Sequence, residues 1–269
     1  MRRFFLVHVL FTGTLFGSPD SAVVTGDSVR VRSEADTDAR IVTVLNKGDA
    51  VTITERSENK TIAGITAPWV RIEYRGCPAR SGWIFGAYLA TDLPSAMELF
   101  EEAKSLEVNS PELAVNRYRS LIQKYPAAMY SHGCHGNTTI KAEAEIRIGI
   151  ASCRMESRQG LPSLAELRSR FSVALKERRN ELLASLLDCS VSHTTGPLSL
   201  ENAPDASAAQ ILKAVGAKEV IYDRISVKAP NRIVVPLKAA GGMQHIFYAG
   251  KTGSGFLIQA VCYFCAEMP

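Results

Sequence analysis

The sequence lacks a long hydrophobic run. The longest, Phe4–Phe16, spans about 13 residues and contains polar ones, whereas a membrane-spanning helix needs about 20. A pair of arginines precedes this run and Gly17-Ser18 follow it, which is the layout of a secretory signal. We expect residues 1–21 to be a signal peptide and the remaining chain to be periplasmic or extracellular, with no stable membrane span. The alternative is an uncleaved amino-terminal anchor.

The sequence also lacks a large excess of either charge. It has 31 basic and 27 acidic residues, for a formal net charge of +4, and nucleic-acid-binding domains usually carry a pronounced basic patch. We therefore exclude nucleic acid as a partner. The composition is that of folded soluble domains, and 269 residues suffice for about two or three of them.

Cysteines are few and widely spaced. Six of them lie between Cys77 and Cys265, which excludes a dense disulfide framework, although an exported chain can form disulfides. Six cysteines allow about 15 pairings, and Cys134 with Cys153 is one candidate pair. Cys262 and Cys265 lie three residues apart on a predicted strand and so point to opposite faces. We expect small buried side chains there and no redox motif.

Short segments of alternating apolar and polar residues fill the range 22–91. Gly48-Asp49 and Asn59-Lys60 are predicted turns between them. Such a pattern predicts a small antiparallel β-barrel. The apolar positions include Val29, Val31, Val42, Val44, Val51, Ile53, Trp69, Ile72, Trp83, Ile84 and Leu89.

This range resembles the bacterial SH3-like (SH3b) domain family. The resemblance rests on runs that occur in the family's order: Val29-Arg30-Val31-Arg32-Ser33, Val51-Thr52-Ile53, Trp69-Val70-Arg71-Ile72, Gly82-Trp83-Ile84 and Tyr88-Leu89. It implies a barrel of five or six strands that holds a cell-wall peptide or an envelope protein as a scaffold or targeting module. The segments Glu58–Pro68 and Arg75–Ser81 are longer than the family pattern, so loop-borne specificity does not carry over.

The aromatic residues of this range fall into two groups. Strand alternation favours Trp69 and Trp83 as structural core residues of the barrel. Tyr74, Phe85 and Tyr88 are the candidate ligand-binding residues, because an aromatic groove suits an extended peptide.

Residues 92–160 are predicted to be helical. Ser95 and Glu98 form a capping-box pattern, Ser110-Pro111 starts a second helix, and the range 139–156 repeats the same apolar face. In the second helix, Ala114, Tyr118 and Pro126 resemble a tetratricopeptide repeat, which implies a TPR-like connector for protein contact or spacing.

Residues 161–269 are predicted to form an α+β domain. A capping box at Ser163 opens a helix of about 25 residues, and a shorter helix covers 206–215. An antiparallel meander follows, in outline similar to NTF2-like domains but without a supporting motif. Its four predicted strands are 219–227, 232–237, 243–249 and 256–264.

Two side-chain groups resemble reactive sites. Asp188-Cys189-Ser190 with His193 resembles wall cysteine peptidases, but Val191 stands where that family has glycine and the preceding residues are predicted to be helical. His132-Gly133-Cys134-His135 is too compact for tetrahedral metal coordination, so we expect a loop there and no metal or cofactor.

Together these patterns predict a multidomain α+β protein. It would be a non-catalytic exported module that binds a cell-wall peptide or an envelope protein. The alternative function is a wall cysteine peptidase that uses Cys189 and His193.

Overall fold

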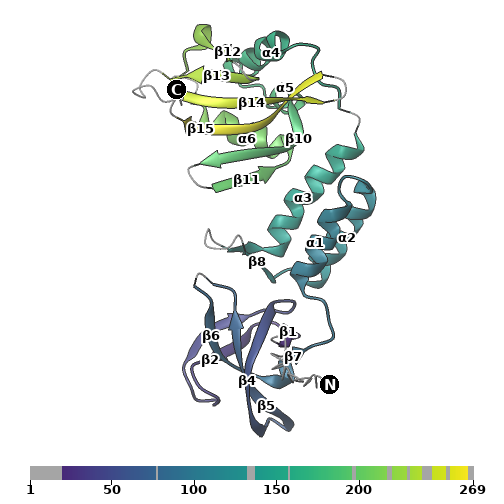
Figure 1. Cartoon of the computed structure of the whole chain (residues 1–269), viewed down its shortest axis with the longest axis vertical. Coiled ribbons are helices and arrows are strands. Elements are labelled where there is room, and N and C mark those ends of the chain that lie inside the picture. Colours follow the sequence, from purple (N-terminus) through teal and green to yellow (C-terminus); the bar gives the residue numbers. More distant parts are fainter. Residues whose placement is uncertain are drawn as a thin grey trace, which may run out of the picture. The chain divides into compact units, whose positions relative to one another are not determined.

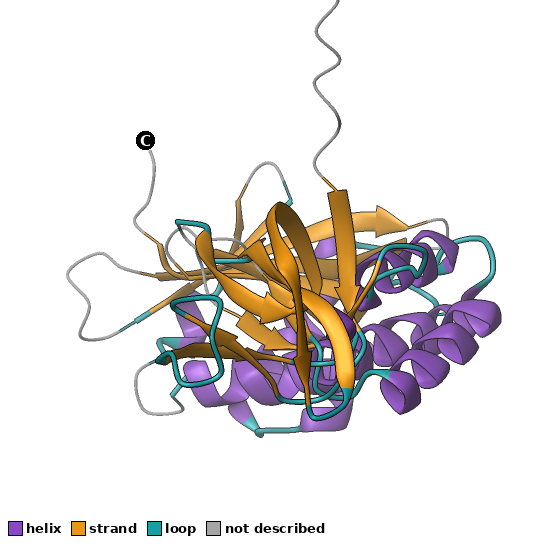
Figure 2. Cartoon of the chain, turned by 90° about the horizontal axis from the view of Figure 1, so that it is seen from below, coloured by secondary structure: helices purple, strands orange, loops and turns teal. Residues whose placement is uncertain are grey.

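The chain divides into two compact units (Figure 1). Unit 1 comprises Met1–Leu45 and Ala50–Leu93, and unit 2 comprises Asn46–Asp49 and Pro94–Pro269. The described chain contains both helices and strands (Figure 2), and all of its α-helices belong to unit 2. The computed structural model describes residues 20–76, 78–131, 137–156, 158–195, 198–216, 220–228, 231–237, 244–252 and 255–265.

Unit 1 is a curled antiparallel sheet, which confirms the predicted SH3-like architecture at that level. Its strand order is β3-β2-β6-β5-β4-β1-β7, and the turn Gly86–Tyr88 (η1) precedes β7. The strands are β1 (Asp20–Val24), β2 (Val29–Arg32), β3 (Ile41–Leu45), β4 (Ala50–Ile62), β5 (Ile65–Tyr74), β6 (Arg80–Phe85) and β7 (Leu89–Ala90).

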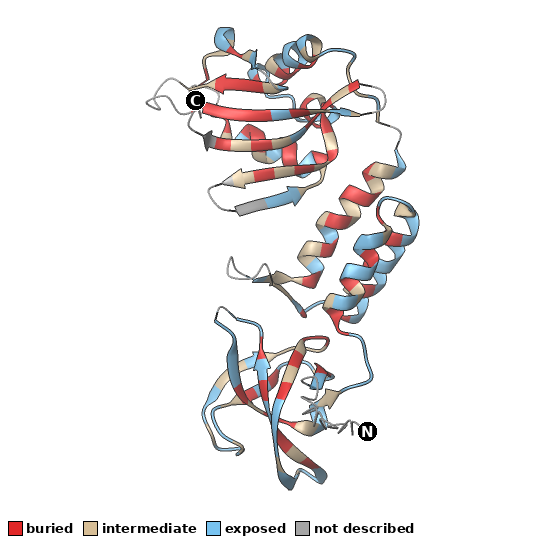
Figure 3. Cartoon of the chain, viewed as in Figure 1, coloured by how far each residue is buried: buried red, intermediate tan, exposed pale blue. Residues whose placement is uncertain are grey.

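Buried and exposed positions alternate along these strands (Figure 3). The inward side chains form one apolar core, whose largest fully buried members are Ile72 and Ile84. A second, smaller cluster contains Ala67, Trp69 and Phe85. It is separate from the core because residues 69 and 85 alternate with the core residues of their own strands.

The hairpin of β4 and β5 is longer than the sequence indicated. Asn59-Lys60, a predicted turn, lies inside β4 and pairs with Ala67 and Pro68 of β5. The chain reverses at Ala63 (φ 48°) and Gly64 (φ 81°) instead, and two consecutive residues with positive φ are the signature of a type I′ hairpin turn. The predicted turn at Gly48-Asp49 is present, with Gly48 at φ 93°.

Three helices open unit 2: α1 (Ala96–Leu106), α2 (Pro111–Lys124) and α3 (Ile140–Met155). The capping box that starts α1 is formed in both directions between Ser95 and Glu98. Helix α2 packs against both of the others around buried Phe100 and Tyr118. The hairpin of β8 (Met129–Ser131) and β9 (Asn137–Thr139) separates α2 from α3, and the tetratricopeptide similarity is not confirmed.

A six-stranded mixed sheet forms the rest of unit 2, in the order β11-β10-β15-β14-β13-β12. Strands β13, β14 and β15 match three of the predicted meander strands, whereas β10 and β11 were not predicted. The predicted strand 219–227 is wrong over most of its length, because β12 covers only Ser226–Lys228 and Tyr222–Arg224 form a 3-10 turn. Strand β10 runs parallel to β15, so the sheet is not purely antiparallel. The strands are β10 (Leu187–Thr195), β11 (Leu198–Asn202), β12 (Ser226–Lys228), β13 (Arg232–Pro236), β14 (Gln244–Thr252) and β15 (Gly255–Cys265).

The predicted helix of about 25 residues is broken into α4 (Leu164–Lys176) and α5 (Asn180–Ser185). Arg178 adopts φ 57°, and the Arg179 N–H donates to the Ala174 carbonyl across 3.0 Å. This is a left-handed helix end in which arginine stands where glycine is usual. The apolar faces of α4, α5 and α6 (Pro204–Ala214) pack on the sheet in one large core.

A buried ionic cluster joins the helices of unit 2 to the sheet. Glu107 is only 1% exposed and accepts hydrogen bonds from Tyr118 (2.8 Å), from Arg147 Nε (2.7 Å) and from Arg154 (3.1 Å). Arg147 also pairs with Glu201 of β11. Burial raises the pKa of the Tyr118 phenol, so the phenol stays protonated and donates.

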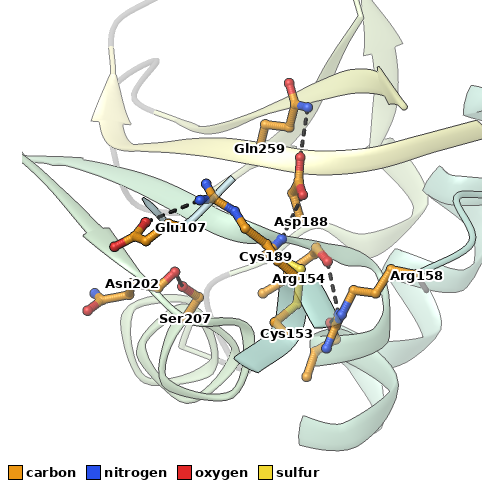
Figure 4. Close-up of a disulfide and its surroundings, with 11 residues drawn as sticks. Glu107, Cys153, Arg154, Arg158, Asp188, Cys189, Asn202, Ser207 and Gln259 are labelled. Carbon is orange, nitrogen blue, oxygen red and sulfur yellow. Dashed lines mark hydrogen bonds and ion pairs between the residues drawn. A yellow bond between two sulfur atoms is a disulfide. The ribbon is translucent and has the colours of Figure 1, made fainter. Parts of the chain in front are cut away.

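A disulfide between Cys153 and Cys189 joins α3 to β10 (Figure 4). The candidate pairing of Cys134 with Cys153 is therefore wrong, because a sulfur forms only one such bond. Cys262 is disulfide-bonded as well, so the expectation of a simple buried side chain there was also wrong. No helix in the described ranges combines the length and the apolar character that crossing a membrane requires.

Removing the disulfide should weaken unit 2. The bond closes a loop with a sequence separation of 36, and loop-closure entropy of that size corresponds to roughly 3–4 kcal/mol. We expect Cys153→Ala/Cys189→Ala to unfold at a lower urea concentration than the oxidised wild type. An unchanged midpoint would show that the unfolded chain is not constrained by this bond.

Two matched substitutions in the ionic cluster should lower the free energy of unfolding by different amounts. Glu107→Gln leaves two arginines around an uncharged buried amide and should destabilise the protein by about 3–5 kcal/mol. Glu201→Gln removes the other partner of Arg147, but Glu201 is 51% exposed, so its loss should cost less than about 1 kcal/mol. Urea unfolding of both variants gives the comparison, and equal losses would contradict it.

Candidate functional site

The candidate site is a groove in unit 1 with a volume of about 370 Å³. That volume lies in the range of about 300–1,000 Å³ that is usual for ligand sites. The groove has an aromatic floor, a wall formed by the tip of the β4–β5 hairpin, and an opposite wall formed by β2 and the residues before it. Its lining residues are Asp27, Ser28, Val29, Arg30, Arg32, Thr37, Ile62, Ala63, Ile65, Trp69, Phe85 and Tyr88.

Three rings form the floor. Trp69 and Phe85 meet edge to face, with centroids 5.8 Å apart and an interplanar angle of 62°. Phe85 and Tyr88 meet in the same way at 6.3 Å and 68°. These geometries are favourable for aromatic pairs. Trp69 and Phe85 are nearly buried, while Tyr88 is 42% exposed, so the row of rings leads from the interior of the unit to solvent.

The backbone holds the three rings in place. Trp69 and Phe85 are direct cross-strand partners on β5 and β6, and the Trp69 N–H donates to Ser57 Oγ across 3.0 Å. The Tyr88 carbonyl accepts from the Thr25 N–H at 2.9 Å. A side chain at Gly86 would approach the Pro68 carbonyl to 2.8 Å, so this tight connection between Phe85 and Tyr88 requires glycine.

The indole Nε1 of Trp69 is buried and has no hydrogen-bond partner among the described residues. Indole nitrogen is a donor only, and leaving a buried donor unpaired costs about 1–3 kcal/mol. Such an atom in the floor of a groove is a candidate contact for a ligand acceptor.

One wall of the groove is basic. Arg30 and Arg32 both project from the outer face of β2, because Val29 and Val31 occupy the inner face. Arg32 donates one hydrogen bond, to the Ala39 carbonyl at 2.5 Å. Within the described ranges, neither arginine forms an ion pair with a carboxylate. Asp27 is the one acidic residue among the lining side chains.

Only some of the predicted site residues lie at the groove. Phe85 and Tyr88 line the groove, although Phe85 is buried, and their role in ligand binding stays a prediction. Tyr74 belongs to the barrel core and is 9% exposed, so it does not line an exposed groove. Trp69 is buried and Trp83 is half-buried, but both lie on the outer face, in or against the second cluster. Sequence reasoning missed that Trp69 forms part of the groove.

Both residues of the alternative catalytic site, Cys189 and His193, are bonded or hydrogen-bonded to other side chains. The Cys189 sulfur is bonded to Cys153 and is therefore not a thiolate nucleophile in this structure. Cys189 lies on strand β10, which begins at Leu187. His193 is 2% exposed, with Nδ1 2.8 Å from the Tyr263 hydroxyl and Nε2 2.8 Å from Ser207 Oγ.

The contact of His193 with Ser207 is not that of a base with a nucleophile. Ser207 donates its hydroxyl proton to the Asn202 carbonyl at 3.3 Å, so its oxygen accepts from His193 Nε2. Nδ1 then accepts from Tyr263. Burial lowers the pKa of His193 to about 4, which keeps the ring neutral near pH 7 in this hydrogen-bonded chain.

Described residues of unit 2 also line two depressions. One, of about 700 Å³, lies between α4 and the turn Tyr222–Arg224 (η3), and its Arg168 donates to the Ile225 carbonyl at 3.2 Å. The other, of about 440 Å³, lies beside β11. Two of its charged lining residues, Arg147 and Glu201, pair with each other.

No group of three or more His, Cys, Asp or Glu side chains in the described parts of the chain could hold a metal ion. The motif His132-Gly133-Cys134-His135 lies outside the described residues, so the expectation of a loop without metal stays a prediction.

Residues 27–90 match the sequence family Bacterial SH3 domain. No curated protein matches this chain. Among solved structures, the crystal structure of an NTF-2 like protein of unknown function from Silicibacter pomeroyi is 17% identical, over 37% of this chain and 89% of that one, with a TM-score of 0.24. That score supports no structural argument, so the NTF2-like outline of the carboxy-terminal domain stays a prediction.

His193 predicts an acid-dependent loss of stability. Its pKa is about 4 in the folded protein and 6.5 in the unfolded chain, and burial also lowers the pKa of His245. The unfolded state therefore binds protons first, and stability falls as the pH decreases from about 6.5 to 4. His193 alone accounts for roughly 3 kcal/mol of this loss.

The measurement is the free energy of unfolding at a series of pH values, for wild type and His193→Gln. The variant is less stable at pH 7 but should show a shallower dependence between pH 6.5 and 4. Equal slopes would mean that His193 titrates alike in the folded and unfolded states.

Proposed function

We propose that this protein is an exported, non-catalytic binding module whose amino-terminal barrel holds an extended peptide from the bacterial cell wall or from an envelope protein. It would act as a scaffold or targeting module. The single observation that carries the proposal is the groove with the Trp69, Phe85 and Tyr88 floor, inside the segment that matches the Bacterial SH3 domain family.

The shape and chemistry of the groove suit a peptide. Rigid aromatic rings provide a large apolar contact area and lose little conformational entropy when a ligand binds. The wall formed by the tip of the β4–β5 hairpin contributes Ile62 and Ile65, and Ile65 is 50% exposed. An extended chain lying between rings and aliphatic side chains, with polar groups at the edge, is a common mode of peptide recognition.

A role without bond cleavage is supported by the state of the candidate nucleophile. A cysteine peptidase needs a free thiolate beside a histidine base. Here Cys189 is in a disulfide, and both ring nitrogens of His193 are hydrogen-bonded to other side chains.

Export is supported by two independent features. The amino-terminal sequence has the layout of a secretory signal. The bonded state of Cys153, Cys189 and Cys262 suits an oxidising compartment and is unusual in the cytosol. We assign unit 2 the role of a second binding or assembly unit, with its helices α1–α3 as connector.

Co-sedimentation with purified murein sacculi tests the proposal. Wild-type protein should sediment with the sacculi, and Tyr88→Ala should bind about tenfold more weakly, since it removes the most exposed ring of the floor. Leu93→Ala is a matched control in the same unit, because Leu93 is 47% exposed and does not line the groove.

Two results would count against the proposal. Equal affinity of the Tyr88→Ala and Leu93→Ala proteins for sacculi would show that the groove is not the binding site. Release of soluble murein fragments by wild type, but not by a Cys153→Ala/Cys189→Ala protein, would support the cysteine peptidase alternative.

A further inference from the structure

The groove has polar groups that contact with apolar side chains does not explain. They are the guanidinium groups of Arg30 and Arg32 and the carboxylate of Asp27, beside the Trp69 indole with its buried Nε1. A groove that only held apolar side chains would need none of them. Their arrangement indicates which ligand chemistry the site selects.

The floor supplies one hydrogen-bond donor. Trp69 is 3% exposed, and its Nε1 is unpaired in the described structure. Its backbone N–H, by contrast, is paired with Ser57. Buried donors in native proteins are almost always paired, so a ligand acceptor at this point would recover a hydrogen bond that folding leaves unmade. The acceptor that every peptide carries is a backbone carbonyl.

The basic wall supplies charge. Arg30 and Arg32 are two residues apart on one strand, so both side chains lie on the same face of the sheet. Arg30 is exposed, and Arg32 uses one of its five N–H groups on the Ala39 carbonyl. Guanidinium groups bind carboxylates by paired, charge-assisted hydrogen bonds. Asp27 limits the positive charge of the lining to about one unit, which disfavours nonspecific binding of polyanions.

We propose that the groove selects a short cell-wall peptide with free carboxylates, which Arg30 and Arg32 bind while the Trp69 indole N–H donates to a peptide carbonyl. This inference rests on the proposed function and adds the determinants of specificity. A volume of about 370 Å³ accommodates only a few residues. Wall peptides are short and carry several carboxylates within that length, whereas an internal protein segment carries them only on Asp or Glu side chains.

The test uses full-length protein with Trp83→Phe, so that Trp69 is the remaining tryptophan of the two in the chain. Its fluorescence is titrated with the synthetic peptide L-Ala-D-Glu-L-Lys-D-Ala and with the same peptide amidated at both carboxyl groups. The free-acid peptide should bind at least about tenfold more tightly, and both peptides should shift the Trp69 emission.

Matched charge variants identify the residues responsible. Arg30→Gln and Arg32→Gln should each remove most of the preference for the free acid. Arg71→Gln is the control, because Arg71 is also exposed on a strand of unit 1 but does not line the groove. The preference for the free acid should also decrease with added salt in wild type.

The outcomes separate this inference from the function on which it rests. Equal binding of the two peptides would overturn the carboxylate selection and leave peptide binding in place. Equal binding of an all-L acidic peptide of unrelated sequence would overturn the assignment to the wall. Sedimentation with sacculi without binding of either peptide would overturn the inference alone, and failure to bind sacculi or any peptide would overturn the proposed function as well.

Discussion

The site depends on which face of β5 and β6 points into the barrel. Val70, Ile72 and Ile84 are inward, and a strand can only place alternate residues on one face. Trp69 and Phe85 are therefore forced outward, where their direct cross-strand pairing brings the two rings together. With the opposite facing, Val70, Ile72 and Ile84 would lie on the outer face in place of Trp69 and Phe85, and the groove would lose its aromatic floor. The same choice of face decides that Tyr74 is a core residue and that Tyr88, which follows β6 in a short turn, completes the row of rings.

The barrel segment and its family resemblance could be predicted from the sequence because alternating apolar residues and turn signals act locally. Which face of each strand points into the barrel could not be predicted. Trp69 and Val70 are adjacent and both apolar, and shifting the register by one residue exchanges the two faces, so Trp69 was predicted to be a core residue. The hairpin tip was missed for a related reason. Asn59-Lys60 has the composition of a turn, whereas the actual turn, Ala63-Gly64, has only one glycine to indicate it. That tip forms the apolar wall of the groove.

In unit 2, the starts of α1, α2, α3 and α4 could be predicted from the sequence, whereas the end of α4 and the start of α5 could not. Ser95, Thr139 and Ser163 each cap a helix with a side-chain oxygen, and that interaction is visible in the sequence. The end of α4 depends on Arg178 in a left-handed conformation, which arginine rarely adopts. Because leucines continue at helical spacing beyond this point, the sequence favours one long helix. The strand that follows then goes unrecognised, although residues 187, 189, 191 and 193 are all buried, which is a spacing of two.

This alternation also decides the chemistry of the residues that most resemble a catalytic pair. Cys189 and His193 lie on the buried face of one strand, so each has partners from the interior of unit 2: a second cysteine for the first, and Tyr263 with Ser207 for the other. Reaction chemistry requires groups that a substrate can reach and that are free to change their bonding. Cys189 and His193 are already bonded to other side chains. In the groove of unit 1, the indole N–H of Trp69 has no partner among the described residues and Arg30 is exposed, and such donors are suited to holding a ligand.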